Sequence, residues 1–416
     1  MSPTSWSDMM RVFGRIGVLS FGGPAAQIAL MHRELVERHA WLTEAAYLRA
    51  LSLCMLLPGP EAMQLATYAG WRMRGTLGGL LAGLLFVVPG AVVIGVLAVG
   101  YAYYGQLPLV QAAFLGIKAA VIIVVFQALR KVAAKALTGP EGVALAALSF
   151  VALFVFGLPF PLIILAAGIW GFFHQSASHV PLVSDSMGLA YPIRTSVIWG
   201  GLWAAPLVLV WALDQQFLLQ LGLFFSKLAV VTFGGAYAVL AYMTQSVVQD
   251  HGWITTQQMI DALGLAETTP GPLILVTEFV ALLAGFAQSG ISGAIAAGVL
   301  ALWVTFTPCF LWIFVAGPYL EAISAQPRLS AALQAITAAI VGVIANLSVW
   351  FALHVLFKQV HPAGVFAMPL PEWSSFNFNA LVLTFLAAIL MLALNKGFVF
   401  TMGVLALAAL VPAVIG

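Results

Sequence analysis

Charged side chains are scarce in this sequence: Asp, Glu, Lys and Arg make up 7% of its 416 residues, whereas 62% are hydrophobic. A water-soluble domain of this length could not keep so much apolar surface away from water, so we predict that lipid is the solvent. Apolar runs such as Leu77–Val99 approach or reach the roughly 20 residues that cross a bilayer as a helix. Alternating ten-residue strand patterns are absent, which argues against a membrane β-barrel.

Signals of catalysis and of cofactor binding are also missing. Cys54 and Cys309 lie far apart in apolar sequence, so neither a disulfide framework nor a cysteine metal site is indicated. The histidines show no metal-ligand spacing, the Gly-rich stretches lack the Gly-Lys-Ser/Thr ending of an ATP site, and no nucleophile stands with a matching base. We therefore expect no metal, no cofactor, no nucleic-acid partner and no enzymatic activity. The N-terminus lacks the pattern of a signal peptide, and we interpret it as mature.

What the sequence does contain is an internal repeat. Phe21-Gly22-Gly23 recurs 212 residues later as Phe233-Gly234-Gly235, and Pro58-Gly59-Pro60 recurs as Pro270-Gly271-Pro272. Of the 40 positions from Phe21 to Pro60, 16 are identical in the second copy without a gap. Duplicated units that are interrupted by Gly and Pro in apolar sequence are typical of secondary transporters.

The repeat predicts an all-α membrane protein with two homologous multi-helix units joined by one extra transmembrane helix. The first unit covers 1–175, a linker with an unpaired helix at Val197–Leu213 covers 176–216, and the second unit covers 217–416. Each unit is expected to hold two segments broken at the Phe-Gly-Gly and Pro-Gly-Pro motifs, followed by four fuller helices. The expected helices cover 76–104, 108–135, 141–157 and 159–174, then 292–318, 329–357, 376–394 and 398–415.

The unpaired helix and the basic residues predict opposite orientations for the two units. If each unit crosses the membrane an even number of times, one extra helix turns the second unit over. Of the 16 Lys and Arg residues, 12 precede Asp214, and most of these flank the ends of apolar segments. The positive-inside rule is obeyed if those ends lie in the cytoplasm. The equivalent ends in the second unit, Thr244–Gln258 and Ala287–Gly293, carry none. We therefore predict inverted repeats. Lys358 is the one basic residue that does not fit the positive-inside rule in this topology. The prediction is the same whether the broken segments cross the membrane fully or re-enter, because both give the same parity.

The Pro-Gly-Pro motifs indicate breaks in helices at the core of the bundle. Proline removes a backbone donor and glycine tolerates unusual dihedrals, so these motifs interrupt any helix that contains them. In lipid, the exposed backbone is tolerated only where protein or a water-filled cavity satisfies it. Each following half-helix presents free N–H groups and about half an elementary charge, which suits an anion. The alternative is a kinked packing helix. The candidate ligands are Pro58, Gly59, Pro60, Thr269, Pro270, Gly271 and Pro272.

The Phe-Gly-Gly motifs support the same interpretation more weakly, because paired glycines also allow close helix packing. A hydroxyl precedes each motif, Ser20 or Thr232, and a basic residue stands six positions before it, Arg15 or Lys227. We predict that these two basic residues help to bind the anion, although Arg15 could also be an interfacial residue that reaches to the lipid headgroups. The motif residues themselves are further candidates: Phe21, Gly22, Gly23, Phe233, Gly234 and Gly235.

Several charges lie in or beside apolar segments, where each costs at least about 2.5–3.5 kcal/mol at mid-bilayer and therefore needs a partner or a purpose. We predict that Lys118 attracts the anion and that Glu61, Glu267 or Glu278 exchanges the coupling proton, with Asp261 as the next candidate. None of the three Glu residues is matched by an acid in the other unit. The alternative is a structural Lys–Glu pair that locks two helices together.

These motifs resemble those of a known family. The stretch Phe13-Gly-Arg-Ile-Gly-Val-Leu-Ser-Phe-Gly-Gly-Pro24, followed by His32-Arg33-Glu34, Trp41 and Leu57-Pro58-Gly59-Pro60-Glu61, is similar to the signature of the chromate ion transporter family. The second copy resembles the long, two-domain form of that family, and the resemblance covers nearly the whole chain. It implies a multi-pass protein of the bacterial inner membrane that exports chromate, a tetrahedral dianion shaped like sulfate. The resemblance also implies the proton-motive force as the energy source, and chromate resistance.

Several classes of function remain open at this point. A sulfate or other oxyanion carrier would use the same machinery as a chromate exporter. A membrane-embedded enzyme acting on lipid would show an acid/base or metal constellation in one half only, whereas the distinctive motifs here occur in both halves. A scaffold subunit would not need duplicated breaks. The expected partners are chromate or sulfate, protons and the lipid bilayer, with a homodimer as a possible assembly.

Overall fold

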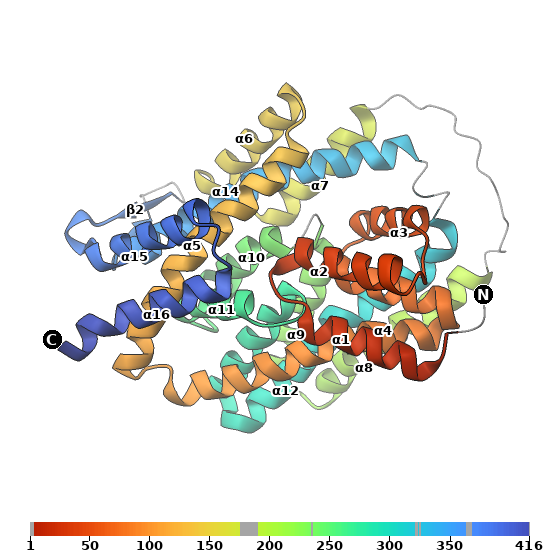
Figure 1. The fold of residues 1–416 in the computed structure, drawn as a ribbon, viewed down its shortest axis with the longest axis horizontal. Coiled ribbons are helices and arrows are strands. Elements are labelled where there is room, and N and C mark those ends of the chain that lie inside the picture. Colours follow the sequence, from red (N-terminus) through yellow and green to blue (C-terminus); the bar gives the residue numbers. More distant parts are fainter. Residues whose placement is uncertain are drawn as a thin grey trace. The chain divides into compact units, whose positions relative to one another are not determined.

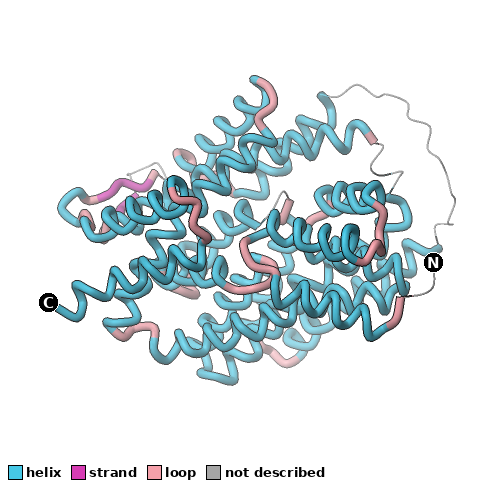
Figure 2. The backbone as a smooth tube through the Cα atoms, in the orientation of Figure 1, coloured by secondary structure: helices cyan, strands magenta, loops and turns pink. Residues whose placement is uncertain are grey.

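The computed structural model describes residues 4–174, 190–233, 236–320, 323, 326–362 and 368–415. These residues are predominantly helical, with one short antiparallel hairpin between β1 (Val360–Pro362) and β2 (Pro369–Pro371) (Figure 2). Within these described ranges, five helical segments are long and apolar enough to cross a membrane: Glu61–Tyr104, Pro108–Ala136, Ala190–Ala212, Leu273–Tyr319 and Pro327–Leu356. The prediction of a helical membrane protein is therefore confirmed, while the inverted orientation of the units stays a prediction.

The helices follow one another along the chain as Figure 1 labels them. The first repeat contains α1 (Trp6–Leu19), α2 (Gly23–His32), α3 (Glu44–Leu56), α4 (Glu61–Tyr104), α5 (Pro108–Ala136), α6 (Pro140–Phe154) and α7 (Phe160–His174). Helix α8 (Ala190–Ala212) precedes the second repeat. That repeat contains α9 (Gln216–Val231), α10 (Ala236–Gln245), α11 (Thr256–Thr268), α12 (Val276–Ala316), α14 (Pro327–Leu356), α15 (Phe378–Ala388) and α16 (Phe398–Ile415).

These helices begin and end close to the ranges expected from the sequence, because local signals mark their ends. Proline occupies the first turn of both α5 and α6, where its missing N–H would have had no intrahelical acceptor. Helix α3 begins after Thr43, whose hydroxyl accepts a hydrogen bond from the N–H of Ala46 at 3.3 Å.

Helices α4 and α12 are each two helices joined by a tight reversal. Within α4, Arg74 and Gly75 leave the helical region, and Gly75 has a φ of 63°. A Cβ atom on Gly70 would collide with the backbone carbonyl of Gly78. Residues eight apart lie about 12 Å apart along a straight helix, so this contact requires the chain to reverse. Helix α12 reverses in the same way at Ser289 and Gly290.

The turn between α2 and α3 is a short polar segment that starts with a π-helix, η1 (Arg33–Arg38). The second repeat has a π-helix at the equivalent place, η2 (Ser246–Asp250). In the first turn, Nε2 of His32 lies 2.6 Å from Oε2 of Glu44, and its Nδ1 lies 3.2 Å from Oε1 of Glu37. The hydrogen bond to Glu44 raises the pKa of His32 above its ordinary value.

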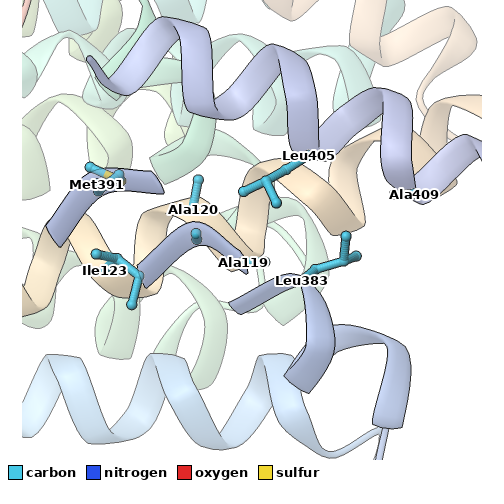
Figure 3. Close-up of a cluster of buried hydrophobic side chains, with 8 residues drawn as sticks. Ala119, Ala120, Ile123, Leu383, Met391, Leu405 and Ala409 are labelled. Atoms are coloured by element: carbon cyan, nitrogen blue, oxygen red, sulfur yellow. The ribbon is translucent and has the colours of Figure 1, made fainter. Parts of the chain in front are cut away.

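The chain forms two compact units that each combine segments from both repeats. The first comprises Met1–Val99, Gln175–Ala236 and Thr269–Ser330, and the second comprises Gly100–His174, Tyr237–Thr268 and Ala331–Gly416. In the second unit, α15 and α16 pack on α5, where small side chains allow close approach (Figure 3). The buried residues of this cluster are Ala119, Ala120, Ile123, Leu383, Ala387, Met391, Leu405 and Ala409.

Candidate functional site

Both Pro-Gly-Pro breaks lie in the first compact unit and interrupt helices as the sequence predicts. The first separates α3 from α4, and the second separates α11 from a 3-10 turn, η3 (Leu273–Leu275), that leads into α12. Gly59 has a φ of 120° and Gly271 a φ of 88°, a region in which side chains other than hydrogen are strained. These glycines are therefore required by the backbone at the two breaks.

The two breaks are bonded reciprocally to the opposite repeat. The N–H of Gly59 donates to the carbonyl of Thr232 at 2.8 Å, and the N–H of Gly271 donates to the carbonyl of Ser20 at 3.1 Å. Ser20 and Thr232 are equivalent residues, each directly before a Phe-Gly-Gly motif. The four motifs are thus connected in two crossed pairs, and each repeat completes the backbone hydrogen bonding of the other.

The second break is held by additional side chains of the first repeat. The hydroxyl of Ser20 also accepts from the N–H of Gly271 at 3.1 Å. The side-chain amide of Gln27 donates to the carbonyl of Gly271 at 2.6 Å and to that of Ser20 at 3.2 Å. The residue equivalent to Gln27 in the second repeat is Val239, which cannot make these bonds. The second break is therefore also held by side chains of the opposite repeat.

At the first break, the carboxamide of Gln64 is fully buried. Its Nε2 donates to the carbonyl of Pro58 at 2.7 Å. Its Oε1 has no hydrogen-bond partner in the described part of the chain. A buried acceptor without a donor is costly, so this atom is suited to accept from water or from another donor when the break opens.

A small cavity lies where the motifs meet in the first unit. Its volume is about 20 Å³, which is room for roughly one water molecule. A tetrahedral oxyanion is larger, so it can enter only if the breaks separate. The lining residues are Pro24, Gln27, Pro60, Glu61, Ala62, Pro272, Leu273 and Ile274.

The backbone donors at the breaks are partly occupied. Because Gly59 and Gly271 donate to carbonyls, their N–H groups are not available to an anion in this conformation. The first turn of a helix leaves N–H groups without intrahelical acceptors, and in α4 this turn includes Ala62 and Met63. The start of α4 is consequently the part of the first break that can offer donors to an anion.

Arg15 and Lys227 occupy exposed positions on α1 and α9. The side chain of Arg15 is 48% exposed, and its Nε lies 3.9 Å from Oε1 of the buried Glu34. Glu34 also lies 3.5 Å from Nη1 of Arg38 and 3.8 Å from Nε2 of His39. Neither Arg15 nor Lys227 lines the small cavity.

The Phe-Gly-Gly motif of the first repeat adopts the conformation that only glycine tolerates well. Gly22 and Gly23 have φ values of 86° and 77°, and α2 begins at Gly23. Phe21 is exposed. In the second repeat, Phe233 is partly buried, whereas Gly234 and Gly235 lie outside the described residues. Thr269 is buried before the second break.

Lys118 belongs to the second compact unit, where it forms a buried ion pair. Its Nζ lies 2.8 Å from Oδ1 of Asp261, with side-chain exposures of 5% and 0%. The hydroxyl of Tyr101 donates to Oδ2 of the same carboxylate at 2.6 Å. This geometry corresponds to the structural lysine–acid pair that the sequence left as an alternative, with Asp261 in place of a glutamate.

The three glutamates differ in their surroundings. Glu61 lines the small cavity at the start of α4. Glu267 is buried in the second unit and accepts a hydrogen bond from the hydroxyl of Tyr237 at 2.8 Å. Glu278 is buried in the first unit, and its Oε2 has no partner among the described residues.

Three residues of these contacts were not predicted from the sequence: Gln27, Gln64 and Tyr101. A signal for the two glutamines exists, since each is an uncharged polar residue within three or four positions of a motif in an apolar segment. Tyr101 gives no comparable signal, because tyrosines near helix ends are common in membrane proteins.

Comparison with known proteins places this duplicated arrangement in a family. The profile of the chromate transporter family matches two segments of the chain, residues 7–172 and 219–412. The chain belongs to the chromate transporter family. Its two matched segments show that the family unit occurs twice, which confirms the internal repeat. No solved structure matches the chain.

Curated relatives are similar over most of their length. A chromate transport protein of Pseudomonas aeruginosa is 33% identical over 359 residues, which is 82% of this chain and 80% of the relative. A chromate transport protein of Cupriavidus metallidurans is 32% identical, covering 81% of this chain and 80% of the relative. A probable chromate transport protein of Synechococcus elongatus is 30% identical, covering 82% and 83%.

Proposed function

We propose that this chain exports chromate across the bacterial inner membrane as a secondary transporter driven by the proton-motive force, and that it thereby confers chromate resistance. The family membership and the names of the relatives support chromate as the substrate. The five apolar segments support a multi-pass membrane location.

The reciprocal hydrogen bonding of the two breaks carries the mechanistic part of the proposal. Each break depends on a carbonyl of the other repeat, so a movement that separates one crossed pair changes the other as well. An anion that enters between the breaks would replace these carbonyls with its own oxygens as acceptors for Gly59 and Gly271. The first turn of α4 would add donors. The hydroxyls of Ser20 and Thr232 donate to the carbonyls of Gly17 and Leu228 in this conformation and would add donors only after rotating away from them.

Charged residues contribute to this proposal in two ways. Arg15 and Lys227 would attract the anion from exposed positions near the Phe-Gly-Gly motifs, and Lys118 would join them if its pair with Asp261 opens. The coupling proton would be exchanged by one of the buried or cavity-lining acids.

The membrane potential favours the proposed direction. Moving one elementary charge across 100 mV corresponds to about 2.3 kcal/mol, so a dianion leaving a cell that is negative inside gains about twice this amount. Export is therefore downhill in the electrical part of the gradient, and uptake of the same dianion would need a larger input from protons.

Everted membrane vesicles test the proposal directly. Vesicles that contain the protein should accumulate labelled chromate when respiration energises them, and an uncoupler should abolish the accumulation. Vesicles with the same lipid but without the protein provide the control. Labelled sulfate in a parallel arm decides whether the chain is a general oxyanion carrier.

Two results would contradict the proposal. Accumulation of chromate that survives complete uncoupling would exclude the proton-motive force as the energy source. Transport of sulfate without chromate would reassign the substrate.

Light scattering of the purified protein in detergent measures whether the chain forms a homodimer.

A further inference from the structure

We propose that Glu278 is the residue that carries the coupling proton, and that it holds this proton in the conformation described here. This inference rests on the proposed function and narrows it to one side chain. It is carried by the geometry around the carboxyl group.

Glu278 is isolated from every polar group that could stabilise an ionised carboxylate. The residue is 6% exposed and lies in the first helix of α12, shortly after the second break. No salt bridge or hydrogen bond among the described residues includes it, and its Oε2 is buried without a donor. The segment that contains it, Leu273–Tyr319, is long and apolar enough to cross a membrane, and its apolar neighbours Leu275, Phe279 and Leu282 are buried.

An ionised carboxylate in such a place is far more costly than a neutral one. Transfer of an isolated charge into an apolar interior is so unfavourable that the group binds a proton instead. Acidic residues inside transmembrane segments are therefore rare and mark proton or ion pathways. The neutral, protonated form of Glu278 is the form that fits these surroundings.

The other buried acids have partners that explain them. Asp261 pairs with Lys118 at 2.8 Å and accepts a hydrogen bond from Tyr101, so its charge is compensated. Glu267 accepts a hydrogen bond from Tyr237. A carboxyl with fixed partners is a structural element, whereas Glu278 has none that its deprotonation would break.

Charged groups on the elements around α12 do not reach Glu278. Helix α12 packs against α8 and α9, and its Gly-rich neighbour α4 approaches Glu278 at Gly95. None of the titratable or charged side chains on these elements forms a salt bridge or hydrogen bond with Glu278 among the described residues. These side chains are Tyr191 and Arg194 on α8, Lys227 on α9, Cys309 on α12, and Glu61, Tyr68, Arg72, Arg74, Tyr101, Tyr103 and Tyr104 on α4.

The position of Glu278 connects the proton to the break. It lies six residues beyond Pro272, within the helix that the second break allows to move. A Cβ atom at Gly95 would stand 3.5 Å from Oε1 of Glu278, so at this position α4 approaches the carboxyl without a side chain. A shift of α12 against Gly95 can admit water to Oε1 and let the proton leave.

Proteoliposomes with a clamped membrane potential test this assignment. Labelled chromate is followed for the wild type, Glu278→Gln and Glu267→Gln, with Glu141→Gln on the exposed start of α6 as the matched surface control. A pH gradient of one unit supports up to about tenfold accumulation for each coupled proton. Chromate counterflow without a gradient measures the substrate-loaded steps alone.

We expect the wild type, Glu267→Gln and Glu141→Gln to respond to the pH gradient. Glu278→Gln should lose this response and retain counterflow, because its amide imitates the protonated state permanently. Proton uptake or release on addition of chromate to the purified protein, read with a pH dye, should be present in the wild type and absent in Glu278→Gln.

Each remaining outcome contradicts the inference in a distinct way. A gradient response in Glu278→Gln, or its loss in Glu267→Gln alone, moves the proton elsewhere. Wild-type protein that neither takes up nor releases protons on addition of chromate contradicts the inference, whether or not Glu278→Gln folds. If the wild type transports chromate with no pH dependence, the inference fails while chromate transport stands. If the wild type transports no chromate, the proposed function itself fails.

Discussion

The buried pair between Lys118 and Asp261 offers a sharp test of whether Lys118 holds the fold together or binds substrate. Three variants are required: Lys118→Met, Asp261→Asn, and the two combined. Methionine has a length similar to lysine and no charge, and asparagine keeps an oxygen that can accept from the hydroxyl of Tyr101. The double variant thus removes both charges with little change in volume.

The magnitudes follow from burial. Both side chains are at most 5% exposed, so removal of one partner leaves an uncompensated charge in the interior. Such a change costs about 3–5 kcal/mol, whereas replacement of the whole pair by neutral groups of similar volume is close to neutral. We therefore expect each single variant to be strongly destabilised and the double variant to regain most of the loss.

The assay combines stability with transport. Unfolding in detergent with increasing denaturant gives the free energy for each variant, and the four values form a double-mutant cycle. Chromate transport in proteoliposomes is then measured for every variant that folds. The Lys118→Met/Asp261→Asn variant should transport with wild-type apparent affinity if the pair is structural.

Two results would refute this reasoning. Single variants as stable as the wild type would show that the charges are hydrated or absent in the folded protein. A stable double variant with a greatly weakened affinity for chromate would show that Lys118 binds the anion, as the sequence first suggested.

Gly90→Ala should lower the free energy of unfolding by about 1–3 kcal/mol, because its new Cβ would collide with the backbone carbonyl of Pro270 at the second break. Gly100→Ala is the control, since a Cβ there would have no atom within 4 Å, and thermal unfolding in detergent compares the two variants. The pKa of His32 is raised, so the protonated imidazole stabilises the α2–α3 turn fully below about pH 6.5, and this stabilisation is lost as the pH rises through the folded-state pKa. Amide hydrogen exchange in this turn should therefore speed up with pH by more than its intrinsic increase. The excess should vanish in His32→Gln. Single cysteines at the exposed residues Glu37 and Asp250, in a chain without Cys54 and Cys309, should react with an impermeant thiol reagent from opposite faces of the membrane, and reaction from the same face would exclude inverted repeats.

Local chemistry explains why the broken segments and helix ends were predictable. Proline and glycine act on the backbone of their own residue, so the breaks at Gly59 and Gly271 follow from the sequence without knowledge of their neighbours. The same holds for the start of the second helix of α4, which follows Gly75. Family membership was predictable because the motifs occur in a fixed order in both repeats.

Long-range partners were not predictable, because nothing local specifies them. Lys118 and Asp261 are separated by more than 100 residues, and several acids were equally plausible partners in the sequence. The isolation of Glu278 is likewise a property of its surroundings. The sequence around a glutamate two turns beyond a break does not indicate whether a hydrogen-bond donor faces its carboxyl group in the fold. Only the folded arrangement distinguishes a paired acid from an unpaired one.

The crossed hydrogen bonds also show how a duplicated chain can be asymmetric at its centre. Both repeats make one equivalent hydrogen bond, in which the glycine of the Pro-Gly-Pro motif donates to the carbonyl that precedes the Phe-Gly-Gly motif of the opposite repeat. The first repeat adds the hydroxyl of Ser20 and the amide of Gln27 to the second break. Because the hydroxyl of Ser20 shares the one N–H of Gly271 with the Ser20 carbonyl, the full additional hydrogen bond is the one from Gln27, which contributes about 0.5–1.5 kcal/mol. At the first break the corresponding bond comes from the break's own repeat, because the amide of Gln64 donates to the carbonyl of Pro58. The asymmetry therefore lies in which repeat supplies the side-chain amide: Gln27 ties the second break to the opposite repeat, and Gln64 ties the first break to its own.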